Sequence, residues 1–163
     1  IMRKLSSGFT LIEVMVVIVL VGVLASMVHI SLGDNNGRNA RLEADVLLEV
    51  MYGLREKAVL DGQEYGLRLE PDAYQVMRFE RVGWQPADSR VQLPSGLVLA
   101  LALEGRPQPL LPMAQVPQLL WLSSDENSAF SLHLDSPPQR WRSIVCDGLG
   151  DAQVVVPEVS HEG

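Results

Sequence analysis

The sequence predicts an α+β fold, in which a long N-terminal helix precedes a mainly antiparallel β-sheet or a two-sheet β-sandwich. Three observations support this prediction. An apolar run near the N-terminus carries a single charge, at Glu13. A four-residue apolar repeat over residues 41–60 is typical of an amphipathic helix, and from residue 65 the apolar period shortens to two, as in half-buried strands. Elements with one apolar face bury that face against one another in a layered domain.

Length and charge limit what the chain can be. Its 163 residues suffice for one domain of ordinary size with a short appendage. Twenty acidic side chains against 13 Lys and Arg give a net charge of -7, so most of the surface repels a phosphate backbone and nucleic acid is not an expected partner. Cys146 is the single cysteine, which excludes an intramolecular disulfide and indicates a small, half-buried apolar position.

Residues 9–32 are predicted to form a transmembrane and assembly helix. The 19 residues 14–32 carry no formal charge, and the whole span of 24 residues has Glu13 as its only charge. A helix needs roughly 20 residues to cross a hydrocarbon core of about 30 Å. The length and composition therefore favour a single-pass membrane protein.

Two basic residues, Arg3 and Lys4, precede the apolar run. Such residues hold a flanking segment in the cytoplasm, which sends the rest of the chain across the membrane. A secretory signal peptide is the competing interpretation, and Ala25-Ser26 resembles a cleavage site. The charge of Glu13 inside the run and the apolar residues that continue beyond Ser26 count against it.

Glu13 is the unusual residue of this run. Insertion scales place the cost of an acid at the centre of a membrane helix at about 2.5–3.5 kcal/mol, and less near the interface. In one interpretation the carboxylate lies near the cytoplasmic headgroups and reaches water. In the other it is buried and pairs with a positive group on a neighbouring protomer. Composition alone leaves both interpretations open.

A polar cluster, "GDNNGRN", predicts a flexible joint at residues 33–40. Residues 41–60 are then predicted to form an amphipathic helix, which Gly62 ends. The apolar repeat consists of Leu42, Val46, Val50, Leu54 and Ala58, joined by Leu47 and Met51. The charged residues of this helix are expected to form a solvated face.

The rest of the predicted domain beyond the membrane, residues 41–156, is rich in strands. A hairpin is expected from strands at 65–69 and 74–81, and a central strand, apolar on both faces, at 97–103. Further strands are predicted at 119–122, 130–134, 141–146 and 153–156. Residues 157–163 are predicted to be a disordered tail.

Residues 104–118 are predicted to form a long exposed loop. Four prolines within this stretch oppose regular pairing, because proline donates no backbone hydrogen bond. Leu110, Leu111 and Met113 are apolar residues within it. They either fold back over the core or form a contact surface for a neighbouring protein.

The motifs of catalysis and metal binding do not occur in the sequence. His29, His133 and His161 are scattered, without the spacing of a metal site, and neither a nucleophile elbow nor a glycine-rich phosphate loop is present. The oxygen-rich segments "SSDENS" at 123–128 and "DGLGD" at 147–151 lack the pattern of an EF-hand and are interpreted as polar turns, with calcium binding as the less favoured alternative. Neither a catalytic residue nor a cofactor is therefore predicted.

The N-terminus resembles that of type IV prepilins and type II secretion pseudopilins. In "RKLSSGFTLIEVMVVIVLVGVLA" a short basic leader ends at Gly8, followed by Phe9, Glu13 and an apolar helix. The resemblance implies that residues 1–8 are a leader, that a prepilin peptidase cuts between Gly8 and Phe9, and that the same enzyme methylates the new amine of Phe9. It also implies that Glu13 meets the N-terminal amine of an adjacent subunit, so that each charge offsets the burial cost of the other.

Two softer similarities narrow the family to GspH-type minor pseudopilins, which have a pilin-like fold. Residues 47–86 resemble the start of their soluble domain, and residues 119–134 resemble a later strand-turn-strand segment. The cysteine pair common in major pilins is absent. The resemblance implies a structural subunit, near or at the tip of a periplasmic filament, in a type II secretion system of a Gram-negative bacterium.

The partners implied by this resemblance are the major and minor pseudopilins, the prepilin peptidase and the inner-membrane secretion platform. Contact with secreted protein substrates is left open. Two alternatives remain at this stage. One is a FimT-like minor pilin of a type IV pilus, which an accessible basic cluster would support. The other is a signal-anchored periplasmic enzyme, whose active site the sequence does not reveal.

Overall fold

The computed structural model describes residues 8–157, apart from the side chains of residues 26–34. The first element is a single helix, α1 (Leu11–Asp61). The chain divides into two compact units, one ending at Asn35 and the other beginning at Asn36. Among the described residues, no helix is both long enough and apolar enough to qualify as a membrane span. Arg3, Lys4, His161 and the predicted tail beyond Pro157 lie outside the described residues.

Residues 33–40, predicted to be a flexible joint, are helical, because α1 runs through the polar cluster, and the boundary between the two units falls within them. Packing within the second unit accounts for the helix from Asn36 onward. A Cβ placed on Gly37 would lie 3.1 Å from the ring of Trp141, and one on Gly96 would lie 3.0 Å from the Asn36 side chain. The absence of a side chain at Gly37 therefore lets the helix approach Trp141 closely, and these contacts outweigh the weak helix propensity of Gly and Asn.

The amphipathic helix predicted at 41–60 is confirmed as the second half of α1, but its buried stripe differs from the expected one. Leu42 and Val46 are 56% and 47% exposed. Leu47, Met51, Leu54 and Ala58 are buried as expected, and Ala40 and Ala44 continue the buried stripe in place of Leu42 and Val46. Because an α-helix has 3.6 residues per turn, a strict four-residue repeat drifts around the surface, whereas alternating steps of four and three stay on one face.

The C-terminal end of α1 lies where the sequence places it. Gly62 has a φ of 62°, and the Gln63 N–H donates to the Ala58 carbonyl over 3.2 Å. This is the bond of a Schellman cap, in which glycine takes the left-handed conformation. The chain then turns directly into the first strand.

The first sheet contains β1 (Tyr65–Leu69), β2 (Ala73–Glu80), β3 (Gly83–Pro86), β4 (Val91–Gln92) and β7 (Leu119–Trp121). Its order is β3-β2-β1-β7, with β4 also paired to β2, and the neighbouring strands are antiparallel. The predicted hairpin of β1 and β2 and the predicted strand at β7 are confirmed. Strands β3 and β4 are short, and neither was predicted.

The second sheet contains β5 (Val98–Leu103), β6 (Arg106–Gln108), β8 (Ala129–Ser136), β9 (Gln139–Asp147) and β10 (Gln153–Val155). Its order is β10-β9-β8-β5-β6, again antiparallel. Strand β6 contradicts part of the predicted loop at 104–118. Pro107 is tolerated there because β6 is an edge strand, where the missing donor breaks no ladder. Strand β5 is buried on alternate residues only, at Leu99 and Leu101.

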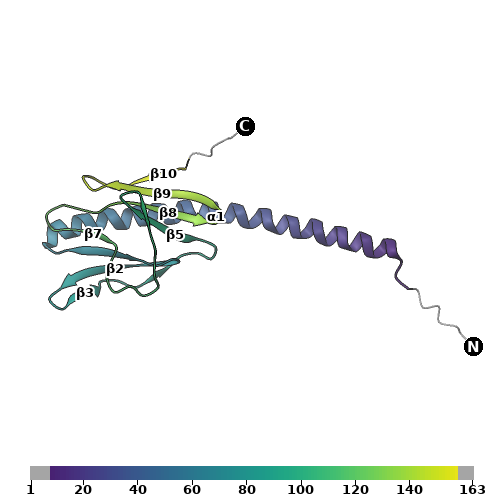
Figure 1. Cartoon of the computed structure of the whole chain (residues 1–163), viewed down its shortest axis with the longest axis horizontal. Coiled ribbons are helices and arrows are strands. Elements are labelled where there is room, and N and C mark those ends of the chain that lie inside the picture. The colour runs from purple at the N-terminus through teal and green to yellow at the C-terminus, as the bar shows by residue number, and fades with distance from the viewer. Residues whose placement is uncertain (1–7, 158–163) are drawn as a thin grey trace, which may run out of the picture. The chain divides into compact units, whose positions relative to one another are not determined.

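One core joins α1 to both sheets, which confirms the predicted α+β class. Figure 1 shows the C-terminal half of α1 running beside the strands of both sheets. The largest fully buried side chains come from all three layers: Leu47, Met51, Leu67, Leu69, Leu119, Leu132, Leu134 and Ile144. Cys146 is predicted to be half-buried, but it is buried in the core.

Residues 109–118 form a segment that we call the strap, which crosses from β6 to β7. It is attached at several points to β1 and to the residue that follows β1. Gln118 donates to the Leu69 carbonyl and accepts from the Leu69 N–H, and Arg68 donates to the Ala114 carbonyl. A Cβ on Gly66 would lie 2.4 Å from Pro117, so only glycine leaves room for the strap at this point. The strap is therefore an ordered part of the fold.

Candidate functional site

The residues singled out at the N-terminus lie at the start of α1. Thr10 caps the helix, because its Oγ1 and its carbonyl both accept from the Glu13 N–H, at 3.4 and 3.1 Å. The sequence Thr-Leu-Ile-Glu fits the capping-box pattern, in which Ser or Thr precedes Glu by three residues. This role of Thr10 was not predicted, although the capping-box pattern is visible in the sequence. Glu13 thus also lies where a helix dipole favours a negative charge.

Gly8 and Phe9 precede the cap in an open environment. Phe9 is 81% exposed, and a Cβ placed on Gly8 would meet no heavy atom within 4 Å. The described fold therefore does not itself require glycine at this position. Any requirement for a small residue comes from a molecule that acts on this segment.

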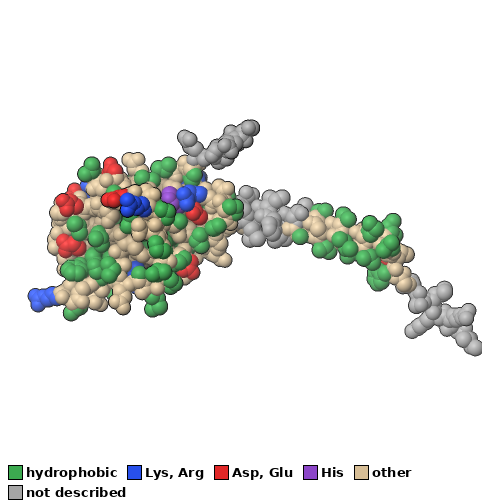
Figure 2. All heavy atoms as spheres, viewed as in Figure 1, with side chains coloured by type: hydrophobic (Ala, Val, Ile, Leu, Met, Phe, Trp, Pro, Cys, Tyr) green, Lys and Arg blue, Asp and Glu red, His purple; other side chains and the backbone are tan. Residues whose placement is uncertain are grey.

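The helical surface that follows is apolar on all sides. Every apolar side chain larger than alanine between Leu11 and Leu24 is exposed, and Glu13 is the only charged residue among them. Figure 2 shows hydrophobic side chains along the visible face of this described part of the helix, whereas acidic and basic side chains are numerous on the visible face of the globular unit. A helix that is apolar all round is normally buried in lipid or between other helices. This surface therefore needs a cover from outside the described chain.

The two oxygen-rich turns contact the same basic side chain of α1. Arg55 makes two hydrogen bonds to Asp125, of 2.8 and 3.1 Å, and one of 2.6 Å to Asp151. The Arg55 guanidinium lowers the pKa of Asp125 through this hydrogen bonding. No group of three His, Cys, Asp or Glu suited to a metal ion occurs in the part of the chain that the structure describes. The guanidinium of Arg55 thus supplies the positive charge that a bound cation would otherwise supply to the carboxylates of these turns.

His133 and Cys146 both make local contacts within the second sheet. The Nδ1 of His133 lies 2.7 Å from the Ser143 hydroxyl, and burial lowers the pKa of the imidazole. The thiol of Cys146 lies 3.5 Å from the Gly150 carbonyl, at the turn between β9 and β10. These contacts give both side chains a structural role, and His29 has no described side chain.

Glu70 anchors the strap through a buried carboxylate. Its Oε1 accepts from the Met113 N–H over 2.8 Å, and its Oε2 pairs with Arg90. The Met113 N–H and the Arg90 guanidinium together lower the pKa of Glu70 below its ordinary value of 4.5, against the opposing effect of burial. Met113 itself projects outward and is 80% exposed. Among the apolar residues of the predicted loop, Leu110 folds back onto the core. Leu111 and Met113 are exposed.

Acidification is expected to weaken this anchor. Because the pKa of Glu70 is lowered by folding, its stabilisation is complete above pH 4.5 and is lost as the pH falls through the lowered pKa. At neutral pH we expect Glu70→Gln to reduce the free energy of unfolding by about 1–3 kcal/mol. Denaturant unfolding of both proteins between neutral pH and pH 3 should show this gap narrowing. A gap that stays constant would mean that the ionised form of Glu70 is not what holds the strap.

These features define a class of protein: a pilin-like subunit, in which a long apolar N-terminal helix continues into a helix packed on antiparallel sheets. The comparisons with known proteins agree. Residues 3–28 match the model of the prokaryotic N-terminal methylation motif. The type II secretion system protein H of Pseudomonas aeruginosa is 40% identical over 161 residues, which cover 90% of this chain and 94% of the relative. The chain belongs to the family of the type II secretion system protein H, the GspH-type pseudopilins.

Two further similarities extend this result. The type II secretion system protein H of Aeromonas hydrophila is 29% identical over 181 residues, covering 98% of this chain and 99% of the relative. The crystal structure of the minor pseudopilin EpsH from the type II secretion system of Vibrio cholerae superposes with a TM-score of 0.65 and 25% identity. That superposition covers 76% of this chain and 97% of the solved one. The fold expected from the resemblance is therefore confirmed.

Proposed function

We propose that this chain is a minor pseudopilin that acts by assembly, as a structural subunit of the periplasmic filament of a type II secretion system. The observation that supports this most strongly is the exposed apolar surface of the helix between Leu11 and Leu24. Lipid covers such a surface before assembly, and the helices of neighbouring subunits cover it afterwards. Major and minor pseudopilins and the inner-membrane platform are the corresponding partners.

In this proposal residues 9–32 anchor the protein once in the inner membrane of a Gram-negative bacterium. The N-terminus stays in the cytoplasm and the unit that begins at Asn36 lies in the periplasm, which agrees with the basic residues before the run. Arg55, His133 and Cys146 have structural partners in this unit, so none of them favours the enzyme alternative. Membership of the protein H family favours a secretion filament over a type IV pilus.

We also propose that a prepilin peptidase removes residues 1–8 and methylates the amine of Phe9. The exposure of Phe9 and the open space around Gly8 support access to this bond. The methylation motif that spans residues 3–28 supports the same assignment.

Substitution of Gly8 tests the cleavage site. We expect Gly8→Ala to be processed nearly normally and Gly8→Val to retain the leader, because a bulky side chain next to the scissile bond obstructs the peptidase rather than the fold. Mass spectrometry of the protein from membranes that contain the peptidase measures the outcome. A mature chain that begins anywhere other than at methylated Phe9 would contradict the proposal.

The last element of the proposal is that Glu13 pairs with the N-terminal amine of a neighbouring subunit. Its support is the position of Glu13 in the first turn of an otherwise uncharged helical segment. When this segment is packed against other helices, a carboxylate without a cation is costly, so correct docking is favoured over other registers. This pairing would use the side chain of Glu13, whereas the observed bonds to Thr10 use its backbone N–H.

A further inference from the structure

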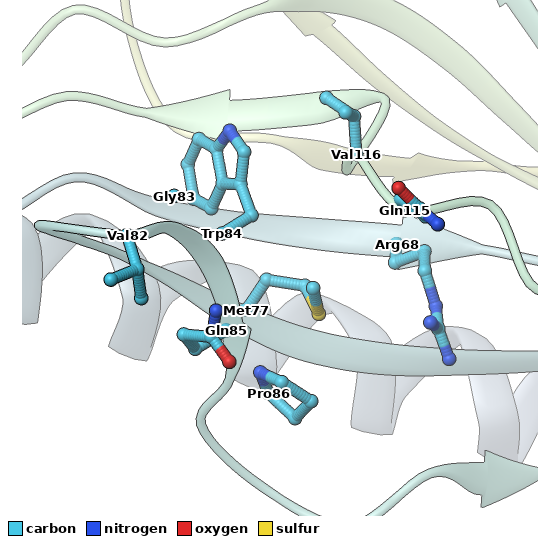
Figure 3. Close-up of a pocket in the computed structure, with 9 residues that line it drawn as sticks. All are labelled: Arg68, Met77, Val82, Gly83, Trp84, Gln85, Pro86, Gln115 and Val116. Atoms are coloured by element: carbon cyan, nitrogen blue, oxygen red, sulfur yellow. The ribbon is translucent and has the colours of Figure 1, made fainter.

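The outer face of the first sheet contains a groove whose lining combines apolar side chains with one arginine. Strand register places Met77 opposite Pro86 and Phe79 opposite Trp84. The rings of Phe79 and Trp84 pack edge to face, 5.3 Å apart. The groove itself is lined by Arg68, Met77, residues 82–86, Gln115 and Val116. Figure 3 shows Met77 between Trp84 and Pro86, with Arg68 and Gln115 at the other end.

The strap forms one wall of this groove and is held in place without any ligand. Gln115 and Val116 belong to the strap, which is fixed on both sides of them. Arg68 donates to the carbonyl of Ala114, and Pro117 packs over Gly66. Since ordering this wall costs nothing further on binding, the groove is preorganised for an occupant.

Arg68 makes the groove positive within an acidic protein. No Asp or Glu lines it, and none of the ion pairs in the described part of the chain involves Arg68. Its two described hydrogen bonds go to neutral oxygens, on Gln75 and Ala114, and its Nε is buried without a hydrogen-bond partner. Glu70 interacts with Arg68 at longer range, but its direct partner is Arg90. The charge complement of this end of the groove is therefore a carboxylate.

We propose that the groove binds an extended segment of another pseudopilin, which places an apolar side chain against Trp84 and Pro86, above the buried Met77, and a carboxylate at Arg68. Apolar contact contributes affinity and the charged hydrogen bond fixes the register of the segment. A secreted protein with the same chemistry and a second copy of this chain are the competing occupants. We favour another pseudopilin because the inference rests on the proposed function, in which different pseudopilins meet in one filament.

Photocrosslinking in cells that make the complete secretion system tests this proposal on the full chain. The crosslinking amino acid replaces Val82, which lines the groove and is 82% exposed, or Leu149, which is 90% exposed on the turn after β9. We expect a product with another pseudopilin, identified by mass spectrometry, from the Val82 position. The Leu149 position is the control, because it measures crosslinking from an exposed residue that does not line the groove.

The decisive variant is Gln115→Glu, which changes the charge of the groove without changing its shape. The new carboxylate lies beside Arg68 and competes with that of the partner, so the Val82 product should fall about tenfold, as expected for the loss of a charged hydrogen bond. Gln153→Glu makes the same change on exposed β10, outside the groove, and should leave the product unchanged. An unchanged yield in Gln115→Glu, or an equal fall in both variants, overturns the charge complementarity.

The nature of the product separates the remaining outcomes. Crosslinking to a second copy or to a secreted protein overturns the proposed occupant, as does the absence of any product from Val82. If the chain is processed and co-purifies with the other pseudopilins in that case, only the groove proposal fails. If the chain is neither processed nor associated with them, the proposed function fails as well.

Discussion

Leu47→Ala is expected to lower the free energy of unfolding by about 2–5 kcal/mol, the range measured for large-to-small substitutions in closely packed cores. Leu47 is completely buried on the face of α1 that packs on both sheets. Its removal leaves a cavity that strands on either side cannot close without disturbing their own registers. The loss is large compared with the total stability of a typical domain, about 5–15 kcal/mol.

Leu42→Ala is the matched control for this prediction. It deletes the same atoms from the same helix, but Leu42 is 56% exposed, so its effect on stability should stay within about 0.5 kcal/mol. Urea unfolding of the full chain in detergent, followed by tryptophan fluorescence, measures both variants. Equal losses at the two positions would contradict the orientation of α1, and a larger loss at Leu42 would favour the strict four-residue stripe.

The helix shows which parts of the fold could be predicted from the sequence. Its extent at the C-terminus was predictable because Gly62 is a local signal, and its amphipathic character because the apolar residues recur. The face of the helix that is buried could not be predicted. Leu42 and Val46 are as apolar as the buried residues, whereas Ala40 and Ala44, which are buried, are too small to mark a buried face in the sequence. Which of two adjacent stripes faces inward depends on the shape of the sheets, and in particular on close approach near Gly37.

The strands divide in a similar way. Strands with alternating or continuous apolar residues, such as β1 and β8, were predicted within a few residues. Strands β3, β4 and β6 were missed because each is short and has little apolar pattern, and β6 contains Pro107. They pair because a neighbouring strand supplies a partner, which is information that no window of sequence contains. The order of the strap is likewise set by Gly66 and Glu70, and the bond from Met113 to Glu70 spans 43 positions of sequence.

The candidate site is a local motif, and for this reason it could be located from the sequence alone. Gly8, Phe9 and Glu13 lie within six consecutive residues, so no folding was needed to bring them together. By contrast, the contact of Arg55 with Asp125 and Asp151 joins three segments that are distant in sequence. Each segment of sequence, taken alone, predicts a separate polar turn. The fold brings the two turns together around the guanidinium of Arg55.

The capping-box pattern and the proposed pairing in the filament make different demands on the side chain of Glu13. The capping box requires a side chain that accepts a hydrogen bond, and both Glu and Gln satisfy this at the third position of a helix. Pairing with the amine of a neighbouring subunit requires a negative charge, which Gln lacks. A comparison of Glu13→Gln with Glu13→Val therefore separates the local role from the role in assembly.

We expect both variants to enter the membrane and to be processed, because each removes a charge that is costly in hydrocarbon. Both should then fail to co-assemble with partner pseudopilins, since the neighbouring amine is left buried without its counter-charge. Breaking such a pair costs about 3–5 kcal/mol, which corresponds to a loss of co-assembly on the order of a hundredfold or more. Co-purification of processed protein with the other pseudopilins measures this loss. If Glu13→Gln assembled like the wild type and only Glu13→Val failed, capping of the helix would explain the acid, and the pairing proposal would be wrong.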